Sequence, residues 1–465
     1  MDNPNSVLDL IGNTPMLKTK NLDTGKCELF LKLECQNPGG SIKDRIALKM
    51  INDAEKQGLL KPGGCIVEAT AGNTGLGLCL VAAAKGYRMI IVVPDKMSKE
   101  KIYHLRAMGA EVIVTRSDVM KGHEEYYQEI AEKISKEENA FYINQFCNKS
   151  NPQTHYESTG PEILRQMNDD VDAVICGVGS GGTISGLANF FKENSSKTEM
   201  ILADPQGSIL VDYLETGKFG EAGSWIVEGI GEDFIPEIAD FTNVKKGYTI
   251  SDEESCATAR EVLLKEGILA GSSSGTLISA ALKYCREQTT PKRVVTFACD
   301  SGNKYLSKVF NDNWLINEGL KKPNRTGNLQ ELILNLYANK SVIYCNPSEK
   351  VSVAITKMTN NDISQLPVID NGEVIGVVDD TCILKNSHLK EFNFSSIVSE
   401  IMNKKFNTIE VSSDINNLYN SFENSNYVIV KKNNNFIGLI TKIDFISYLK
   451  NNIEVKENWK IQETN

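Results

Sequence analysis

The chain has 465 residues, 41% of them hydrophobic and 24% charged, and its formal net charge is −10. This length exceeds one ordinary domain, and an acidic chain without clustered Lys and Arg is not a general binder of nucleic acid. Eleven cysteines without CxxC spacing and only four histidines argue against a disulfide framework or a structural zinc site. Because there is neither a leader pattern nor an apolar run of about 18 residues, we expect a cytoplasmic protein that does not bind membranes.

Residues 27 to 300 alternate short apolar runs with helical patterns such as 41–58 and 99–109. Nearly continuous apolar strands between helices predict a mostly parallel sheet covered on both faces, and hence an α/β fold. Ligands of such sheets bind where the carboxyl ends of strands turn into helices. We expect strands at residues 27–34, 64–69, 88–94, 110–115, 172–179, 200–206 and 293–300.

The pattern changes near residues 315–335, where a polar stretch with Pro and Gly predicts a linker. Beyond it, residues 364–380 and 425–444 resemble each other, since each predicts a strand, a polar turn and a second strand after a helical run. We expect two paired copies of a βαββα-like unit with a period of about 60 residues, against the alternative of two unrelated hairpins. The domains are then expected at residues 1–318, 335–390 and 391–455, with a linker at 319–334.

The first of three glycine-rich turns is EATAGNTGLG, residues 68–77, directly after an expected strand. Gly72, Gly75 and Gly77 leave backbone N–H groups open at a helix start, which suits an anion such as a carboxylate. The alternative is a tight turn whose small residues pack a helix against the sheet.

The second turn is GVGSGGTISG, residues 177–186, where the hydroxyls of Ser180 and Thr183 join backbone amides that can bind a phosphate. A dinucleotide site is the alternative, because residues 177–182 fit GxGxxG and Asp204 lies near the expected spacing for a ribose ligand. No Gly-Lys-Ser/Thr closes the loop, which excludes a P-loop.

The third turn, LAGSSSG at residues 269–275, offers small residues for the close approach of a ligand. Ser301 follows a later strand end, where its hydroxyl could meet a ring nitrogen. Lys43, in GGSIKDR, lies at a strand-to-helix junction, and it could be a solvated charge, a phosphate ligand or the amine of a Schiff base. Pyridoxal phosphate is the cofactor that needs both an aldehyde-reactive lysine and a phosphate site.

Over residues 7–320 the chain resembles the fold-type II pyridoxal-phosphate enzymes in the order and spacing of its motifs. The motifs are the stretches named above together with NPQTHYESTGPEI, DPQGSIL, VEGIGEDFIP and DSGNKYLSKVF. Within that group the chain is most similar to the cystathionine β-synthases, and the C-terminal repeat resembles a pair of CBS domains. The resemblance implies two open, mostly parallel sheet subdomains followed by an α+β CBS module.

The resemblance also implies roles for single residues. Lys43 would bind the cofactor as a Schiff base and then act as the base at the substrate Cα, while Asp44 and Arg45 would order the loop and the helix start. Asn73 would bond the 3′-hydroxyl of the cofactor, Ser301 would face its pyridine nitrogen, and Gly179, Ser180, Gly181, Gly182 and Thr183 would hold its phosphate. The substrate would contact Thr70, Ala71, Gly72, Thr74, Gln145, Gly229 and Glu232.

The implied reaction is a β-replacement in transsulfuration, in which L-serine or L-cysteine condenses with L-homocysteine to L-cystathionine and releases water or hydrogen sulfide. Three departures leave the donor open between serine, O-acetylserine and cysteine: Ala71 where many relatives have serine, and Phe146 and Glu232 where animal relatives have tyrosines. Glu232 could equally be a solvated charge on a lid. An O-acetylserine-dependent cysteine or cystathionine synthase is the alternative enzyme, and a nucleotide-sensing protein with an inert first domain is the alternative class.

We expect no haem, because the extension that carries the haem ligands in animal relatives does not precede VLDLIGNTP here. In the CBS pair, Thr441 and Asp444 fit the pattern of an adenosyl-ribose site, whereas the first copy has Asp379 and Cys382 at those positions. Adenosylmethionine is the implied effector, against a dimerisation module that binds nothing. A homodimer or a higher homo-oligomer is the implied assembly.

Overall fold

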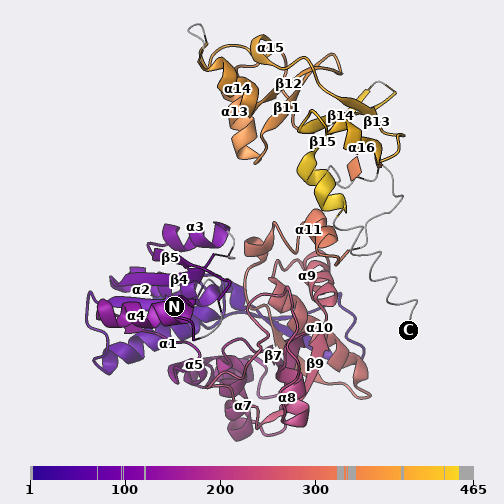
Figure 1. The fold of residues 1–465 in the computed structure, drawn as a ribbon. Helices are drawn as coiled ribbons and strands as arrows, with labels where there is room; N and C mark the ends of the chain where they lie inside the picture. The colour runs from indigo at the N-terminus through magenta and orange to yellow at the C-terminus, as the bar shows by residue number, and fades with distance from the viewer. Residues whose placement is uncertain are drawn as a thin grey trace. The chain divides into compact units, whose positions relative to one another are not determined.

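The computed structural model describes residues 4–70, 72–95, 97, 99–119, 122–321, 329–330, 332–333, 342–388, 392–433 and 435–449. The chain divides into two compact units, residues 1–311 and 312–465, each of which is described by itself (Figure 1). The division lies before residue 318, where the sequence predicts the end of the first domain, because helix α11 (Asp312–Asn317) belongs to the second unit.

Six strands form the larger sheet of the first unit, and all neighbouring pairs are parallel except β1 and β2. Strand β10 lies between β2 and β7, so that Val295 is opposite both Phe30 and Val174. Segments from the two ends of the unit therefore lie side by side. In spatial order the strands are β1 (Met16–Lys18), β2 (Glu28–Lys32), β10 (Arg293–Phe297), β7 (Ala173–Gly177), β8 (Glu199–Pro205) and β9 (Val244–Ile250).

Four parallel strands form the smaller sheet. Their order is β5 (Glu111–Thr115), β4 (Arg88–Pro94), β3 (Cys65–Ala69) and β6 (Phe141–Tyr142). Each sheet has its own apolar core: Ile175, Leu202 and Val295 are buried in the core of the larger sheet, and Ile66 and Ile91 in that of the smaller one. The two open, mostly parallel sheets that the resemblance implies are confirmed.

Every strand expected from the sequence is present, but β1, β6 and β9 are additional. Strands β1 and β6 have only three and two residues. Strand β9 has the sequence VKKGYTI and buries only part of its residues, so its two lysines and its glycine obscure the strand pattern.

Helices cover both sheets of the first unit (Figure 1). Helix α9 illustrates how the sequence sets helix ends: Ser251 and Glu254 form a capping box at its start, and Gly267 ends it with φ at +72°. The helices are α1 (Lys43–Lys56), α2 (Asn73–Lys85), α3 (Lys99–Ala107), α4 (Tyr127–Glu137), α5 (Ser150–Thr154), α6 (Gly160–Gln166), α7 (Gly182–Asn194), α8 (Leu210–Thr216), α9 (Asp252–Glu266) and α10 (Ser272–Glu287). A π-helical turn, η3 (His155–Thr159), joins α5 and α6 without a break, and short 3₁₀ turns are η1 (Val7–Leu10), η2 (Glu34–Gln36) and η4 (Gly302–Tyr305).

The second unit contains two antiparallel hairpins of matching form. Strand β11 (Gln365–Asp370) pairs with β12 (Glu373–Asp379), and β14 (Tyr427–Lys432) pairs with β15 (Asn435–Thr441). Each hairpin shows one register shift, in both cases after the fourth residue of its first strand. The repeated unit expected from the sequence is therefore confirmed.

The two hairpins pack against each other through a buried cluster that includes Val374, Val377, Tyr427 and Leu439. In addition, the hydroxyl of Tyr427 donates to the carboxylate of Asp379 over 3.2 Å. Further elements among the described residues of this unit are α13 (Val351–Asn360), α14 (Asp380–Asn386), α15 (Val398–Ile401), β13 (Thr408–Glu410), α16 (Asn417–Ser421) and a helix over residues 442–449. Across the described part of the chain, no helix combines the length and the apolarity that crossing a membrane requires.

Candidate active site

A cavity of about 250 Å³ lies in the first unit at the carboxyl ends of strands from both sheets. Thr70 follows β3 of the smaller sheet, whereas Gly179 and Cys299 follow β7 and β10 of the larger one. Parallel sheets bind ligands at this edge. Of the residues that the sequence assigns to cofactor and substrate, those lining the cavity are Lys43, Thr70, Gly72, Asn73, Thr74, Gln145, Gly179, Ser180, Gly181, Gly182, Thr183, Gly229 and Glu232. Ala71 lies outside the described residues.

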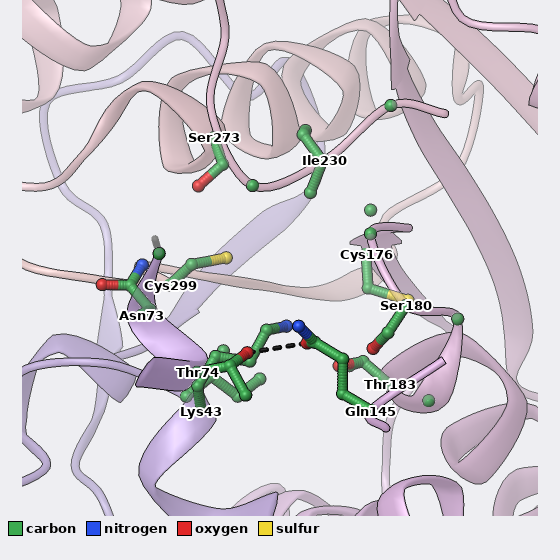
Figure 2. A pocket seen from close by; sticks show the side chains of 18 of the residues that line it. Lys43, Asn73, Thr74, Gln145, Cys176, Ser180, Thr183, Ile230, Ser273 and Cys299 are labelled. Carbon is green, nitrogen blue, oxygen red and sulfur yellow. Dashed lines mark hydrogen bonds between the residues drawn. The ribbon is translucent and has the colours of Figure 1, made fainter. Parts of the chain in front are cut away.

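Lys43 is the first residue of α1, and its side chain lines the cavity (Figure 2). Burial lowers the pKa of its amine, while the nearby Cys299, Asp300 and Glu232 act in the opposite direction. A lowered pKa leaves a larger fraction of the amine neutral near pH 7, and the neutral amine is the form that attacks an aldehyde.

The turn that precedes Lys43 depends on two glycines. Gly40 has φ at +75°, and a Cβ on Gly39 would lie 2.5 Å from Oδ1 of Asp44. The N–H of Gly39 donates to Oδ2 of Asp44 over 2.5 Å, and burial raises the pKa of this carboxyl to about 7. Asp44 therefore serves the geometry of the loop, in line with the sequence-based expectation that it orders the loop.

Arg45 belongs to a buried cluster of charges beneath the start of α1. Its guanidinium donates to Glu34 and to Glu162, over 2.7 Å in each case, and Lys32 donates to Glu162 over 2.8 Å. The three partners lie in different elements: Glu34 in η2, Glu162 in α6 and Lys32 in β2. The cluster therefore connects three parts of the larger subdomain to α1. Arg45 does not line the cavity.

Thr74 and Gln145 form a direct link across the cavity wall, since the hydroxyl of Thr74 donates to Oε1 of Gln145 over 2.7 Å (Figure 2). Behind them lies the buried carboxyl of Glu68, which accepts from the N–H of Asn144 over 2.8 Å. Burial raises the pKa of Glu68 to about 8, although its hydrogen bonds with Asn144 and Gln145 oppose this. The amide of Gln145 is thus held in one orientation beside the N-terminus of α2.

Asn73 is held by two charged partners. Its Nδ2 donates to Asp300 over 2.8 Å, and its Oδ1 accepts from Nζ of Lys304 over 2.5 Å. An amide nitrogen carries two hydrogens, so one remains for a ligand oxygen in the cavity.

The loop from Gly179 to Thr183 forms a cup at the N-terminus of α7. Gly181 has φ at +87°, and a Cβ there would lie 2.6 Å from Ala239; a Cβ on Gly179 would lie 2.6 Å from the carbonyl oxygen of Gly229. The hydroxyls of Ser180 and Thr183 stand on the same side of the cavity (Figure 2). Backbone amides at a helix start together with two hydroxyls fit a phosphate group, and Lys43 in the same cavity fits an aldehyde. The residues present therefore fit pyridoxal phosphate.

The structure does not bring Ser301 into this cavity. Its hydroxyl accepts from the N–H of Asn303 at the start of η4, and it lines a neighbouring cavity of about 770 Å³. Ser273, at the N-terminus of α10, lines the cavity of Lys43 instead (Figure 2). Its neighbours Ser272 and Ser274 accept from backbone N–H groups, at Glu228 over 3.2 Å and at Cys299 over 2.9 Å.

Of the two serines, Ser273 therefore lines the cavity of Lys43, and Ser301 lines the neighbouring one. The sequence signal was the third glycine-rich turn, LAGSSSG, which places three serines at a helix start. Ser301 follows the end of β10 in sequence, but its backbone N–H bonds to the carbonyl oxygen of Gly40 over 3.1 Å, and its side chain caps η4.

Another wall of the cavity contains Glu232, which directly follows two glycines with positive φ, Gly229 at +85° and Gly231 at +87°. Burial raises the pKa of Glu232 to about 8, with further increases from Asp233 and Asp204, while Lys43 opposes them. Glu232 thus lines the cavity and is not a fully solvated lid charge. Phe146, the other departure, also lines the cavity and packs against Phe234 with ring centroids 5.7 Å apart.

Asp204, on which the dinucleotide alternative depends, does not line the cavity. It is buried at the end of β8, where its carboxylate accepts from the N–H of Val211 in α8 over 3.3 Å. This contact gives Asp204 a structural role. The dinucleotide interpretation therefore loses the residue that would have bound the ribose.

In the second unit, Thr441 and Asp444 bond to each other. The backbone N–H of Thr441 donates to Asp444 over 2.8 Å and its hydroxyl does so over 2.5 Å, at the start of the helix over residues 442–449. In the first copy the acid lies three residues earlier, at the position of Thr441, and Asp379 accepts from the N–H of Cys382 over 2.7 Å, as the hydroxyl of Thr441 accepts from the N–H of Asp444 over 3.3 Å. The structure thus uses both acids as helix caps. Within the described ranges, no group of three or more His, Cys, Asp or Glu side chains is arranged to hold a metal ion.

Comparison with known proteins agrees with this arrangement. The family model described as pyridoxal-phosphate dependent enzyme matches residues 7–300, and the CBS domain model matches residues 334–388 and 398–451. A cystathionine beta-synthase of Mus musculus is 37% identical over 435 residues, which cover 91% of this chain and 77% of the mouse protein.

Two further relatives match the first unit. An O-acetylserine dependent cystathionine beta-synthase of Bacillus subtilis is 40% identical over 304 residues, 65% of this chain and 96% of that protein. The crystal structure of a hydrogen sulfide-producing enzyme from Fusobacterium nucleatum superposes with a TM-score of 0.61 at 42% identity, covering 65% of this chain and all of that one. The chain therefore belongs to the pyridoxal-phosphate dependent enzymes and, within them, to the cystathionine β-synthase family, with a pair of CBS domains in its second unit.

Proposed function

We propose that the protein catalyses a pyridoxal-phosphate-dependent β-replacement, which condenses L-serine or L-cysteine with L-homocysteine to L-cystathionine and releases water or hydrogen sulfide. The observation that carries this proposal is that one cavity is lined by both the amine of Lys43 and the cup formed by Ser180 and Thr183. The names of the relatives supply the reaction class, and the residues of the cavity supply the chemistry.

In this proposal the phosphate of the cofactor is held by the loop Gly179–Thr183, its 3′-hydroxyl by Nδ2 of Asn73, and its ring nitrogen by the hydroxyl of Ser273. A neutral serine does not hold the ring nitrogen in its protonated form as an aspartate would, so the ring would be a weaker electron sink, which suits β-elimination. When bound, pyridoxal phosphate supplies an electron-withdrawing ring that stabilises negative charge at the substrate Cα.

The substrate carboxylate is held by the N-terminus of α2. The N–H of Thr74 and the hydroxyl of Thr70 contribute donors, and the hydrogen bond from the hydroxyl of Thr74 leaves the Nε2 of Gln145 as a third donor. Lys43 removes the proton from Cα, holds it on Nζ and delivers it to the departing β-substituent. Its lowered pKa supports this exchange, because a base must be neutral before it can take a proton.

A second candidate has O-acetylserine as the donor. The similarity to the Bacillus subtilis enzyme favours it, because the identity there is 40% over most of the first unit. The two candidates differ in the leaving group at Cβ, acetate instead of water or sulfide, and not in the role of Lys43.

A product assay separates these candidates. The purified enzyme receives serine, cysteine and O-acetylserine in parallel, each with homocysteine and with sulfide, and the products are identified by mass. Cystathionine formed fastest from serine or cysteine supports the main proposal, whereas faster turnover of O-acetylserine supports the second. The Lys43→Ala variant is the control, and activity that survives in it would overturn both.

We further propose that the protein is a cytoplasmic homodimer or higher homo-oligomer, without haem, that responds to adenosylmethionine through Thr441 and Asp444. Buried cysteines such as Cys27, Cys79 and Cys176 are thiols, which suits a reducing compartment. A visible spectrum with a Soret band would contradict the absence of haem, and sedimentation of the purified protein tests the assembly.

A further inference from the structure

A buried helical segment lies directly behind the cup of Gly179–Thr183. Helix α5 and the π turn η3 pack against α7 (Figure 1). The approach is close because α7 has glycines at its first and fifth residues: a Cβ on Gly182 would lie 1.9 Å from Oδ1 of Asn151, and a Cβ on Gly186 would lie 2.2 Å from the carbonyl oxygen of Pro152. These glycines therefore admit the segment in addition to shaping the loop.

Asn151 reaches Ser180 from this segment. Its Nδ2 lies 2.9 Å from the carbonyl oxygen of Gln145 and 2.9 Å from Oγ of Ser180, and its residue is 1% exposed. A backbone carbonyl can only accept, so the nitrogen of the amide, and not its oxygen, must face it. Asn151 consequently donates to Ser180, and the hydroxyl hydrogen of Ser180 is left for another acceptor.

His155 reaches Thr183 in the same way. It is fully buried in η3, with Nδ1 2.9 Å from the hydroxyl of Thr159 and Nε2 3.2 Å from the hydroxyl of Thr183. Burial holds the pKa of His155 well below its ordinary value, and the positive charges of Lys43 and Arg45 lower it further. The ring is therefore neutral, with one N–H to give.

The two tautomers of this ring have opposite effects on Thr183. If Nδ1 carries the hydrogen, the hydroxyl of Thr183 must donate to Nε2 and has no hydrogen left. If Nε2 carries it, the hydroxyl of Thr159 donates to Nδ1, the ring donates to Thr183, and Thr183 can donate into the cup. A phosphate dianion only accepts, so its binding favours the Nε2–H tautomer.

We propose that Asn151 and His155 are positioning residues that donate to the hydroxyl oxygens of Ser180 and Thr183 and so direct both hydroxyl hydrogens toward the cofactor phosphate. This inference rests on the proposed function, because it takes the cup to be the phosphate site. It assigns the segment 150–159 the task of discriminating phosphorylated from unphosphorylated cofactor.

The test compares the affinity of the apoenzyme for pyridoxal phosphate with its affinity for pyridoxal, which lacks the phosphate. Asn151→Asp keeps the shape of the side chain but replaces the donor by an acceptor, and His155→Leu removes the ring N–H. Each variant should lose about tenfold in affinity for pyridoxal phosphate while its affinity for pyridoxal changes less than about twofold. Equal losses for both forms, or no loss, would show that these residues only fill space and would overturn the inference.

Two matched variants sharpen the result. His155→Gln places an amide near the position of Nε2 and should restore most of the discrimination that His155→Leu loses. In a Thr183→Val background, His155→Leu should cause no further loss of discrimination, because the hydroxyl through which it acts is gone. A full additional loss there would contradict a role through Thr183.

A measurement on the unaltered holoenzyme keeps the inference testable if a variant does not fold. The chain has only four histidines, so ¹⁵N spectra of histidine-labelled protein can resolve His155. The Nε2–H tautomer is expected, and the Nδ1–H tautomer would overturn the inference. If the wild-type apoenzyme does not prefer pyridoxal phosphate over pyridoxal, and Ser180→Ala changes nothing, the proposed function fails instead.

Discussion

Nζ of Lys304 donates to Oδ1 of Asn73 over 2.5 Å, which connects η4 of the larger subdomain to the first residue of α2 in the smaller one. The same amine lies 3.5 and 3.4 Å from the carbonyl oxygens of Gly39 and Gly40. Lys304 thereby fixes the orientation of the amide whose remaining N–H faces the cavity.

Replacing Lys304 by Met should therefore weaken cofactor binding. The variant loses a charge-assisted hydrogen bond, for which we expect a loss of about ten- to a hundredfold in affinity for pyridoxal phosphate. Fluorescence titration of the apoenzyme measures this. Lys85→Met is the matched control. Lys85 lies on α2, like Asn73, but its amine pairs with Glu55 over 2.7 Å, so we expect the affinity of this variant for pyridoxal phosphate to be unchanged.

Ser273 and Ser301 offer a direct comparison of two serines near the cavity. Ser273→Ala should shift the absorbance maximum of the bound cofactor and lower kcat about tenfold, because the ring nitrogen loses its hydrogen bond. Ser301→Ala should leave the spectrum unchanged, since its hydroxyl bonds within η4. A spectral shift in Ser301→Ala alone would restore the assignment made from the sequence.

The pH dependence of the step in which the thiol of homocysteine adds to the substrate should show the ionisation of Glu232. With a pKa of about 8, its carboxyl is mostly neutral below pH 8 and charged above it. If the carboxylate takes the proton of the acceptor thiol, kcat/KM for homocysteine rises with pH through about 8. In Glu232→Gln that rise disappears and the value falls about a hundredfold.

The neighbouring acid supplies the control for this profile. Asp233→Asn removes a negative charge that raises the pKa of Glu232, so the rise should persist and move to lower pH. An unchanged profile in Glu232→Gln would assign the rise to Lys43 or to the thiol itself.

Arg45 should matter for stability more than for catalysis. Arg45→Met leaves two buried carboxylates, Glu34 and Glu162, without their main partner, for which we expect a loss of about 3 to 5 kcal/mol in the free energy of unfolding. Lys49→Met, which removes a partly exposed pair with Asp53, should cost less than about 1 kcal/mol. Urea unfolding of the apoenzyme compares the two.

The same cluster predicts how stability responds to acid. Burial acts to raise the pKa of Glu162, but its hydrogen bonds and charge interactions with Arg45 and Lys32 lower it to about 2 from an ordinary value of 4.5. A depressed carboxyl pKa contributes stability above its unfolded value, and this contribution is lost as the pH falls from 4.5 to about 2. Arg45→Met should show a weaker dependence over that range.

Adenosylmethionine binding should depend on the second CBS copy. Calorimetry on the full chain is expected to show heat that Asp444→Ala abolishes and Asp379→Ala retains, because the first copy has Asp379 and Cys382 where the adenosyl pattern has Thr441 and Asp444. No heat with the unaltered protein would favour a module that serves assembly only.

The sequence predicts the strands of the first unit well because they are apolar on both faces and bounded by glycine-rich turns. It fails for β9, whose lysines resemble a solvated loop, and for β6, which is too short to leave a pattern. It also does not show that Ser301 lines a cavity beside that of Lys43, because closeness to a strand end does not fix the direction in which a side chain points. That direction depends on a backbone hydrogen bond to Gly40, a residue far away in the sequence.

Gly182 shows a different limit of sequence reasoning. The motif predicts that it holds a phosphate, and it does line the cavity, but its lack of a side chain also admits Asn151 from α5. Such a contact between distant segments leaves no mark in the spacing of the motif. Asn151 and His155 lie in NPQTHYEST, a stretch that contributes to the resemblance but whose residues had no assigned task.

Because of the π turn η3, the position of Asn151 depends on the number of residues in this helical segment as well as on its side chains. A π turn closes its hydrogen bonds one residue farther along than an α-helix does, so removing one residue between 155 and 159 would allow a regular helix to form. Helix α5 would then rotate by about 100° relative to α6. Gly160 would keep its close contact with Phe190, but Asn151 would turn away from Ser180. Natural variants of this chain should therefore tolerate substitutions in this stretch far more readily than insertions or deletions.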